Sequence, residues 1–459
     1  MAKLTLKQAA SFCGGRVAPE FESVVFDGAC MDTRKIENGQ LFVAICGESR
    51  DGHDFAQAAI DAGAAAVLAE KPLNPSIPAI ITADSRKALG DIARGARQQL
   101  SCKVVGITGS VGKTTTKEMM AAVLASTYDT AKTEKNFNND LGLPMTVLSV
   151  QPEQQMAVFE MGMNHFGEMR YLTSIAKPNV AVIVNIGTAH IGQLGSREGI
   201  LKAKLEILEG LQPGGLIVFN GDEPLLWNLK EQIQPKPIYF GIENQDCDLR
   251  ASNIETTPDG MSFRVCGLAQ NFQVFLPVEG LHHVYDALAV IAAALKLGVL
   301  PAKIQEALAA FRNTGMRQRI YKKNGFTIIE DCYNAGPESM DAALAVLENH
   351  KADGRKIAVL GDMLELGACS PAEHYRIGRL AAIRADRLFT YGKNSARMVL
   401  GAITGGMNEK TAVNFETHEA LAEALANTAK SGDVLLFKGS RGMKMERALE
   451  LFLEKTEKH

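Results

Sequence analysis

The sequence predicts an α/β protein built from three domains. Apolar runs typical of buried strands alternate with helical patterns over residues 104–220 and again over residues 326–437. This alternation is the order that builds parallel sheets covered by helices. One strand-to-helix turn is a Gly-rich loop that ends at Lys113. The chain has 459 residues, and a typical domain has about 150, so the length agrees with three domains.

We predict domain boundaries near residues 82 and 313. Residues 1–82 are expected to form a small α/β domain, and residues 83–313 a central domain with a doubly wound, mostly parallel sheet. Residues 314–459 are expected to form a Rossmann-like α/β domain. No internal repeat or low-complexity tract interrupts this plan.

The first domain shows short elements in sequence order. The pattern predicts a helix from residue 4, a strand at 40–45, a helix at 56–63, a strand at 64–69 and a Pro-rich loop at 71–78. The charged, Gly-rich segment 47–55 follows the first of these strands. Such a segment can bind a diphosphate, although a solvated turn is the simpler explanation of this composition.

The two larger domains carry the strand patterns that are easiest to recognise. In the central domain we predict parallel strands at 104–108, 155–160, 179–185 and 216–220, and an antiparallel excursion over 237–278. In the third domain we predict strands at 326–330, 356–360, 387–391 and 433–437, with helices between them.

The loop after residue 108 has the composition of a phosphate-binding loop. Its candidate phosphate ligands are Gly109, Ser110, Val111, Gly112, Lys113, Thr114 and Thr115. Glycines let backbone N–H groups surround phosphate oxygens, the helix N-terminus adds positive charge, and a lysine reaches the terminal phosphates. The strict motif requires Gly at position 107, where Ile107 stands. The alternative is an ordinary strand-to-helix turn with an incidental lysine.

Several residues near other strand ends are candidate metal ligands. Glu160 ends one predicted strand, and its carboxylate, together with the Thr114 hydroxyl, suits Mg²⁺. His190 follows the next strand and is a second candidate ligand, although a hydrogen-bonded histidine is a simpler explanation. Lys202 and Lys204 lie on a helix after that loop, and either Lys204 lines the site or both are surface lysines.

The third domain adds candidate nucleotide contacts. Asp331 and Asn334 follow a strand, and Asp331 suits either a ribose hydroxyl or a helix cap. Arg317 lies at the predicted hinge, where it would stabilise charge on a transferred phosphoryl group unless it is a solvated linker residue. The loops at 361–367 and 437–442 also follow strands, and His374 lies just beyond the first of them.

Composition excludes several classes of protein. The net charge is −3, and no basic block suits a nucleic-acid backbone. No apolar run reaches the roughly 20 residues of a membrane span, and the first residues lack an apolar signal core. The eight cysteines form no C-x-x-C pair, so we expect reduced thiols in a cytoplasmic protein.

Taken together, these motifs make the chain similar to the Mur ligase family of ATP-dependent amide ligases. The resemblance covers essentially the whole length. It rests on the T-G-x-x-G-K-T-T loop, Glu160, His190 and the Lys204 helix, and on four further stretches: 32–34 with 47–55, 133–144, 359–367 and 438–443. These four favour the members that join D-alanyl-D-alanine to UDP-N-acetylmuramoyl-tripeptide in peptidoglycan precursor synthesis, and hence in cell wall biogenesis, cell shape and cell division.

The resemblance implies a role for each domain and for several residues. The first domain would hold the uridine nucleotide, the central domain ATP, and the third would close over both. Lys113 and its loop would bind the ATP phosphates, Thr114 and Glu160 one Mg²⁺, and His190 with Lys204 a second Mg²⁺. In this family the lysine matching Lys204 is often carbamylated. The residues matching Asp331 and Asn334 contact the nucleotide, and that matching Arg317 contacts phosphate.

The chain departs from the family pattern in two places. Gly336 stands where the family usually has Asn before Pro337. Beside the adenine the family usually has His-Asn followed by a second Asn three residues on, whereas His283 and Asp286 occupy the two Asn positions here. Neutral histidine donates and accepts through different nitrogens, so the adenine contacts at His283 differ from those of an asparagine.

The resemblance also implies a mechanism. The tripeptide carboxylate attacks the ATP γ-phosphate to form an acyl phosphate, which the amine of D-alanyl-D-alanine then attacks, with His190 or His374 as candidate bases. Lys113, Lys204, His190 and Arg317 are the expected catalytic residues, and we expect a monomer. The alternatives are another Mur ligase, a folylpolyglutamate-type ligase, or a nucleotide-switched regulatory protein that hydrolyses ATP slowly.

Overall fold

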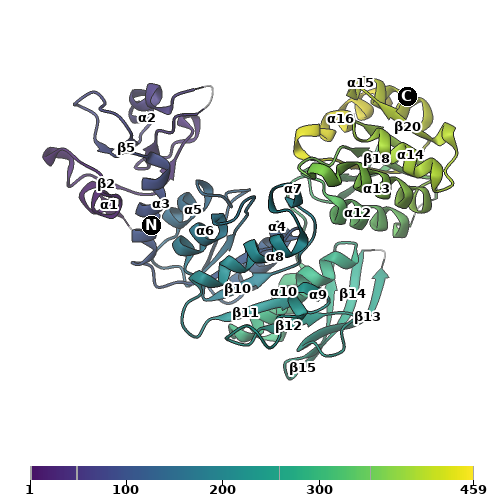
Figure 1. Cartoon of the computed structure of the whole chain (residues 1–459), viewed down its shortest axis with the longest axis horizontal. Coiled ribbons are helices and arrows are strands. Elements are labelled where there is room, and N and C mark those ends of the chain that lie inside the picture. Colours follow the sequence, from purple (N-terminus) through teal and green to yellow (C-terminus); the bar gives the residue numbers. More distant parts are fainter. Residues whose placement is uncertain (1–2, 48–49, 258, 352, 458–459) are drawn as a thin grey trace.

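The computed structural model describes residues 3–47, 50–257, 259–351 and 353–457. It confirms a mixed α/β protein with a large, mainly parallel central sheet and a smaller sheet on either side of it in sequence. In Figure 1 the N-terminal unit (purple) and the C-terminal unit (yellow-green) stand apart, and the central unit (teal) lies between and below them. Glu48 and Ser49 of the predicted diphosphate loop lie outside the described residues.

The N-terminal unit has a four-stranded parallel sheet. Its strand order is β3 (Ala29–Cys30), β4 (Leu41–Val43), β5 (Ala66–Ala69), β6 (Ala79–Ile81). Helices α1 (Leu6–Cys13) and α2 (Ala56–Asp61) accompany it, and β1 (Leu4–Thr5) pairs with β2 (Val25–Phe26). The two predicted strands are β4 and β5. Strand β6 was not predicted, because only three residues separate the Pro-rich loop from the next turn.

Helix α3 (Ser85–Arg97) joins this unit to the central one. Its Gly95 lies against the ring of Phe12 from α1, where a Cβ would come within 2.3 Å of the ring carbons. At its C-terminal end the buried Arg97 donates hydrogen bonds to the carbonyl oxygens of Ala176, Leu100 and Cys102. The N-terminal sheet therefore approaches the central sheet through one closely packed helix.

The central sheet has nine strands, in the order β15-β14-β13-β12-β11-β10-β7-β9-β8. Their bounds are β7 (Lys103–Thr108), β8 (Thr130–Lys132), β9 (Met156–Glu160), β10 (Val180–Ile183), β11 (Leu216–Asn220), β12 (Ile238–Gly241), β13 (Leu249–Thr257), β14 (Gly260–Gly267) and β15 (Gln270–Leu276). The pairings from β8 to β13 are parallel, and only β13-β14-β15 is antiparallel. The predicted antiparallel excursion over 237–278 was therefore wrong for its first strand, β12, which continues the parallel sheet.

Helices cover both faces of the central sheet, as the doubly wound prediction requires. They are α3, α4 (Lys113–Ala125), α5 (Gly142–Ser149), α6 (Glu168–Ala176), α7 (Ile191–Leu194), α8 (Arg197–Leu205), α9 (Pro224–Trp227), α10 (Leu281–Lys296) and α11 (Pro301–Ala309). Alternate strand residues enter two separate cores. Val104 and Phe159 join the core beneath α3, α5 and α6, whereas Val105 and Val158 join the core beneath α4 and α10.

The C-terminal unit has a six-stranded sheet in the order β16-β17-β21-β18-β19-β20. The strands are β16 (Arg319–Lys323), β17 (Phe326–Asp331), β18 (Lys356–Gly361), β19 (Arg387–Tyr391), β20 (Ala412–Phe415) and β21 (Val434–Lys438). Only β16 is antiparallel to its neighbour. The helices are α12 (Pro337–Asn349), α13 (Ser370–Arg384), α14 (Ala396–Thr404), α15 (His418–Thr428) and α16 (Met445–Thr456). All four predicted strands are present, and the two edge strands are additional.

Short 3₁₀ turns complete the chain. They are Pro19–Phe21, Thr33–Lys35, Gly52–Phe55, Glu206–Gly210, Gly367–Cys369, Glu409–Thr411 and Arg441–Met443. Among the described residues, no helix combines the length and apolar character needed to cross a bilayer.

Candidate functional site

The phosphate-type loop lies where three parallel strands end side by side. It follows β7, which pairs with β9 on one side and β10 on the other. Gly112 has φ +83, and a Cβ at this position would lie 2.4 Å from Oδ1 of Asp286. Both the left-handed backbone and the close carboxylate require glycine here. The structure therefore requires the glycine that the phosphate-loop motif has at position 112.

Asn185, just beyond β10, holds the loop in shape. Its Oδ1 accepts hydrogen bonds of 3.0 Å from the N–H groups of both Ser110 and Val111, and its Nδ2 donates to the Val111 carbonyl at 3.0 Å. The Ser110 and Val111 N–H groups are therefore bonded within the protein. The N–H groups of Lys113, Thr114 and Thr115 belong to the first turn of α4, which has no intrahelical acceptors. These N–H groups are the ones best suited to an anion.

Lys113 folds back over this loop. Its Nζ donates to the carbonyl oxygens of Gly109 at 2.7 Å and Ser110 at 3.4 Å. Desolvation lowers the pKa of Lys113, the Glu160 carboxylate opposes that change, and the Arg317 cation adds to it. The structure therefore brings the loop lysine, the strand-end carboxylate and the hinge arginine into one electrostatic environment, as the sequence predicted.

The two predicted oxygen ligands are in direct contact. Thr114 Oγ1 donates to Oε2 of Glu160 at 2.9 Å. Glu160 is 2% exposed, and its other oxygen, Oε1, accepts from Nδ2 of Asn138 at 2.7 Å. Its backbone N–H donates to Oγ1 of Thr133 at 3.0 Å. Asn138 and Thr133 come from the segment after β8, and they orient a buried carboxylate beside the loop.

His190 and Lys204 lie in the segment after β10. Lys204 is 2% exposed in α8, and its Nζ has no hydrogen-bond or ion-pair partner among the residues described. Burial and, after it, Lys113 lower the pKa of Lys204 well below the usual lysine value. Burial, Lys113 and Lys204 lower the pKa of His190 to about 4. In contrast, Lys202 is exposed above the ring of Phe166, so the surface alternative applies to Lys202 and not to Lys204.

The third domain contributes an ion pair near the predicted nucleotide loop. The buried Lys438 donates from Nζ to Oδ2 of Asp331 at 2.5 Å and to the carbonyl of Asn334 at 3.0 Å. Asp331 does not cap α12, because the N-cap is Gly336. The Asn334 side chain is exposed. The lysine of the strand-end loop at 437–442 is therefore already paired, and its arginine, Arg441, pairs with Glu446 at 2.8 Å.

Arg317 and the segment beside it link the domains. The Arg317 guanidinium lies 3.9 Å from the centre of the Tyr333 ring. The neighbouring Gln318 is buried, and its Oε1 lies 3.0 Å from Nε2 of His283. Gln318 Nε2 donates to the carbonyl of Glu279. The hinge arginine is therefore stacked on an aromatic ring beside a segment that is bonded to the central domain.

The pair His283 and Asp286 is buried behind the loop. Asp286 Oδ1 accepts from Oγ1 of Thr116 at 3.0 Å, whereas its Oδ2 has no hydrogen-bond partner among the described residues. Burial raises the pKa of Asp286 to about 7 and lowers the pKa of His283 to about 4. Asp286 thus contacts both the phosphate loop and α4.

The hypothesis that His374 acts as a base does not fit the structure. His374 is fully buried, with Nε2 accepting from the Met363 N–H at 3.0 Å and Nδ1 lying 2.7 Å from the Ser370 carbonyl. With both ring nitrogens bonded, His374 is not available as a base. In the first domain, Asp51 pairs with His53 at 2.5 Å and with Lys71 at 2.7 Å, whereas the exposed Arg50 of the same loop has no ion pair among the described residues.

A cavity of about 580 Å³ adjoins the site on its N-terminal side. It is lined by Asp84, Arg86, Lys87, Asn139, Asp140, Gly162, Asn164, Phe166, Gly167, Glu168, Tyr171 and Leu172. Arg86 of α3 and Asp140 form an ion pair of 2.6 Å in its wall. Asn139 and Gly162 are close in sequence to Asn138 and Glu160. The cavity therefore lies between the start of α3 and the segments that flank the Thr114–Glu160 pair.

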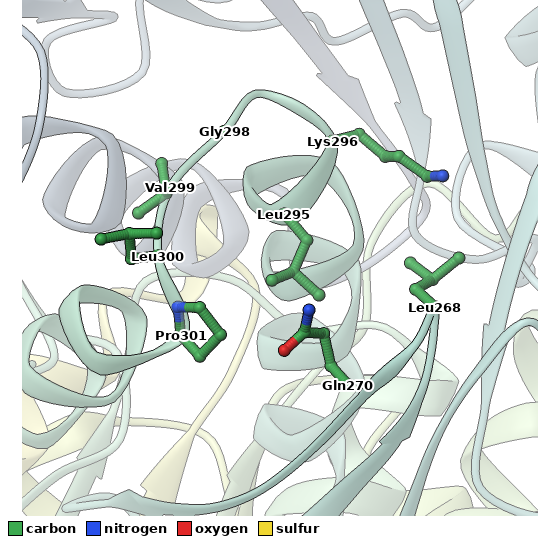
Figure 2. A pocket seen from close by; sticks show the side chains of 8 residues that line it. All are labelled: Leu268, Gln270, Leu295, Lys296, Gly298, Val299, Leu300 and Pro301. Atoms are coloured by element: carbon green, nitrogen blue, oxygen red, sulfur yellow. The ribbon is translucent and has the colours of Figure 1, made fainter.

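A smaller cavity of about 250 Å³ lies elsewhere on the central unit (Figure 2). Its lining comes from the end of α10, the start of α11 and the β14–β15 turn, and Lys296 is its one charged side chain. Tyr128, beyond the C-terminal end of α4, bonds to the Leu297 carbonyl beside it. The phosphate loop is at the opposite end of α4, so this cavity is not part of the candidate site.

The sequence did not single out several residues that shape the site. Asn138 and Asn185 were visible only as parts of longer stretches, and nothing in their spacing indicated that they orient Glu160 and the loop. Glu338 of α12 accepts a hydrogen bond from the N–H of Thr188. Nothing in the sequence indicated this role, because Glu338 reaches the site only when two domains come together. Asn185 ends the predicted strand 179–185, and this position at a strand end was its one signal in the sequence.

Comparisons with known proteins agree with this geometry. Three family models match successive parts of the chain: "Mur ligase family, catalytic domain" at residues 26–99, "Mur ligase middle domain" at 107–294 and "Mur ligase, glutamate ligase domain" at 316–441. The UDP-N-acetylmuramoyl-tripeptide–D-alanyl-D-alanine ligase of Bacillus subtilis is 41% identical over 460 residues, covering 99% of both chains.

Solved structures give the same result. The crystal structure of MurF from Acinetobacter baumannii matches with a TM-score of 0.90 at 33% identity, covering 99% of each chain. The structure of the MurF ligase of Thermotoga maritima in complex with ADP matches with a TM-score of 0.82 at 29% identity, covering 94% of this chain and 98% of that one. With matches that run from end to end, the chain belongs to the Mur ligase family.

Proposed function

We propose that the chain is an ATP-dependent ligase that joins D-alanyl-D-alanine to UDP-N-acetylmuramoyl-tripeptide and releases ADP and phosphate. The observation that carries this proposal is the Thr114–Glu160 contact beside Lys113, with a cavity of about 580 Å³ nearby at the start of α3. The names of the relatives in Bacillus subtilis and Acinetobacter baumannii support the choice of substrates. A nucleotide-linked substrate used with ATP in peptidoglycan precursor synthesis is consistent with a cytoplasmic enzyme.

The three units divide the work between them in this proposal. Residues 1–82 hold the uridine nucleotide, residues 83–313 hold ATP, and residues 314–459 close over both and bring Arg317 and Asp331 to the nucleotide. The ADP bound to the Thermotoga maritima relative supports ATP as the co-substrate. The free N–H groups at the start of α4 suit its phosphates, because a helix N-terminus attracts anions.

The oxygen pair at the strand end fits a magnesium ion. Thr114 Oγ1 and Glu160 Oε2 lie 2.9 Å apart, and both are hard oxygen donors of the kind that Mg²⁺ takes together with substrate phosphates. His190 and Lys204 would serve a second ion. When bound, Mg²⁺ neutralises charge on the phosphate oxygens. Among the described residues, no three His, Cys, Asp or Glu side chains converge as a ready-made metal cage, which fits ions held partly by the nucleotide.

Lys204 suits the carbamylation that we propose for it. Burial and the Lys113 cation lower the pKa of Lys204, which favours the neutral amine, and the free electron pair of a neutral amine can attack the carbon of CO₂. The new N–C bond forms as electrons of one C=O bond move to oxygen, and the nitrogen loses a proton to solvent. The product is an anion that would pair with the second magnesium ion and with the neighbouring cations, so a side chain that lacks a partner would gain several.

The reaction then follows from the positions of these groups. An oxygen of the tripeptide carboxylate attacks the γ-phosphorus, the bond to the ADP oxygen breaks, and an acyl phosphate forms. Lys113 and Arg317 stabilise the charge on the transferred phosphoryl group. The amine of D-alanyl-D-alanine attacks the acyl carbon, loses a proton and expels phosphate. Closure by the third domain excludes the water that would hydrolyse the acyl phosphate.

The direct test of the proposal is ADP release measured with the UDP-tripeptide and D-alanyl-D-alanine, together and singly. We expect rapid ADP release only when both are present, with one ligated product for each ADP. ADP release that is unaffected by omitting the dipeptide would show an ATPase or a ligase for another acceptor.

A further inference from the structure

We propose that Glu338 is a positioning residue that links the docking of the third domain to the loop that carries His190. The proposal rests on the ligase function proposed above. Glu338 lies in the first turn of α12, in the third domain. Its Oε1 accepts a hydrogen bond of 2.7 Å from the N–H of Thr188, which belongs to the central domain. One carboxylate therefore bridges two domains two residues before His190.

The carboxylate lies directly against the backbone of this loop. A Cβ added to Gly187 would lie 2.7 Å from Cδ and 2.8 Å from Oε1 of Glu338. Such distances are too short for any real side chain, so glycine at position 187 leaves the space that Glu338 occupies. The fit depends on the residues of both domains at once.

The same loop is also bonded to the phosphate loop. The N–H of Gly187 donates to Oγ of Ser110 at 2.9 Å, and Asn185 holds both Ser110 and Val111. Glu338, Thr188–Gly187 and Ser110 therefore form a continuous set of contacts from the third domain to the nucleotide site. This continuity gives the third domain a way to influence the position of His190 without touching the substrate.

Two weaker contacts lie beside it. Oε2 of Glu365 is 3.2 Å from Nδ1 of His190. A Cβ on Gly192 would lie 3.2 Å from the carbonyl oxygen of Glu365. The segment after β10 thus meets the third domain at three places, and Glu338 makes the one hydrogen bond among them (Figure 1, between α7 and α12).

The contact between Glu338 and Thr188 can be tested with one substitution, because Glu338 makes a single hydrogen bond there. Oε2 of Glu338 has no hydrogen-bond partner among the described residues, and no ion pair involves Glu338 there. Replacing Glu338 therefore removes one interdomain bond and leaves the Asn185 contacts of the phosphate loop in place. We expect ATP to bind normally in such a variant, and the steps that need the docked third domain to slow.

The test compares Glu338→Ala and Glu338→Gln with a control, Glu450→Ala. Glu450 is an exposed acid of α16 with no hydrogen-bond or ion-pair partner among the described residues. Three quantities are measured for each protein: kcat for ligation, the ATP dissociation constant by calorimetry, and the interdomain distance distribution by small-angle X-ray scattering. For Glu338→Ala we expect kcat to fall about tenfold or more, the ATP dissociation constant to change less than about twofold, and the distance distribution to broaden. Glu338→Gln keeps an oxygen acceptor and should retain most of the activity, and Glu450→Ala should match the wild type.

Gly187→Ala tests the same contact from the other domain. The added methyl group should displace Glu338 and reproduce the loss of kcat, and the double variant with Glu338→Ala should be no slower than either single variant, because both remove one shared contact. Wild-type kcat and scattering in Glu338→Ala would overturn the proposal. So would an equal loss of kcat and ATP affinity together with a lower melting temperature, which marks a residue needed only for folding. If the wild type lacks ligase activity, the proposed function fails, and the scattering and ATP binding still decide the interdomain contact.

Discussion

Lys204 is the residue whose environment departs most from its ordinary chemistry. It is 2% exposed and has no partner among the described residues, and burial lowers its pKa well below the lysine value. An unpaired buried lysine is costly to a fold, so its presence indicates a function that outweighs the cost. We predict that Lys204→Ala lowers turnover by about a hundredfold or more, because the variant cannot form a carbamate or bind the second ion. Steady-state kinetics measures the turnover, and circular dichroism measures whether the variant is folded.

The same helix offers a matched control. Lys202 is exposed, so Lys202→Ala should keep near-normal turnover. Because alanine replaces an unpaired buried amine, Lys204→Ala should melt at or above the wild-type temperature. Near-normal turnover of Lys204→Ala would show that the reaction does not require Lys204.

The raised pKa of Asp286 predicts how the stability of the protein depends on pH. Burial raises its pKa from 3.8 to about 7, so the folded state keeps the proton to a higher pH than the unfolded state does. The stabilisation from this proton is complete below about pH 4 and is lost as the pH rises through about 7. Asn cannot ionise and retains an oxygen for Thr116. We predict that the loss of unfolding free energy between pH 5 and pH 8 is smaller in Asp286→Asn than in the wild type by about 1–3 kcal/mol.

Denaturant unfolding at the two pH values measures this difference. Burial lowers the pKa values of three histidines, His190, His282 and His283. Their contribution to the free energy of unfolding therefore has the opposite pH dependence, because it is lost as the pH falls below 6.5. All three histidines remain in the variant. The contribution of His190 cancels in the comparison, whereas His282, whose pKa the Asp286 carboxylate raises, and His283, 3.6 Å from that carboxylate, respond to the substitution. Equal pH dependence of the two proteins would show that Asp286 is ionised in the folded state throughout this range.

At the residue scale, the sequence predicted the parts of the site that a single strand-loop-helix unit defines. Lys113 and Thr114 follow β7, Glu160 ends β9, and parallel strands carry such ends to one edge of the sheet. The sequence could not predict the contacts of Glu338 and Asp286. These contacts depend on how α12 and α10 pack across the loop, and no local pattern encodes that packing.

At the scale of elements, two glycines allow α13 and α14 to pack against each other at short distance. A Cβ on Gly378 of α13 would lie 1.9 Å from the carbonyl oxygen of Met398, and a Cβ on Gly401 of α14 would lie 2.1 Å from that of Tyr375. Each helix therefore approaches the backbone of the other. The closeness explains two glycines inside helices, where glycine is otherwise unfavourable.

Opposing effects make Gly378→Ala an informative variant. Helix propensity alone would stabilise it by up to about 1 kcal/mol. Overpacking against a backbone oxygen costs about 1–3 kcal/mol, and the helices must separate to admit the methyl group. We therefore predict net destabilisation, seen as faster hydrogen exchange in peptides from α13 and α14. Exchange as slow as in the wild type would mean that propensity dominates and the approach is looser than described.

Strand prediction succeeded where a strand is buried on both faces and failed at sheet edges. β10 and β21 are continuous apolar runs and were predicted. β16, with the sequence R-I-Y-K-K, is mostly exposed and charged because it lies at an edge, so it has no apolar pattern to recognise. β12 was assigned to an antiparallel region because short alternating strands follow it in the sequence, and pairing direction cannot be read from one strand alone.

At the scale of the whole molecule, the site is shared between the central unit, whose core beneath α3 continues into the N-terminal unit, and a third domain with cores of its own. The start of α3 forms one wall of the larger cavity, the central sheet supplies the phosphate loop, and the third domain brings Arg317, Asp331 and Glu338. The core clusters of the third domain are distinct from those of the central sheet. This division suits a reaction whose intermediate must be protected from water until a second substrate arrives.

The central claim is that ATP activates a peptide carboxylate as an acyl phosphate at this site. The most direct test uses UDP-tripeptide labelled with ¹⁸O in its terminal carboxylate, together with ATP and D-alanyl-D-alanine, and mass spectrometry of the released phosphate. The account predicts that each phosphate released carries one labelled oxygen from the carboxylate, while the ligated product keeps the other. Unlabelled phosphate alongside ligated product would contradict it, because the γ-phosphoryl group would then have been transferred to water and not to the peptide.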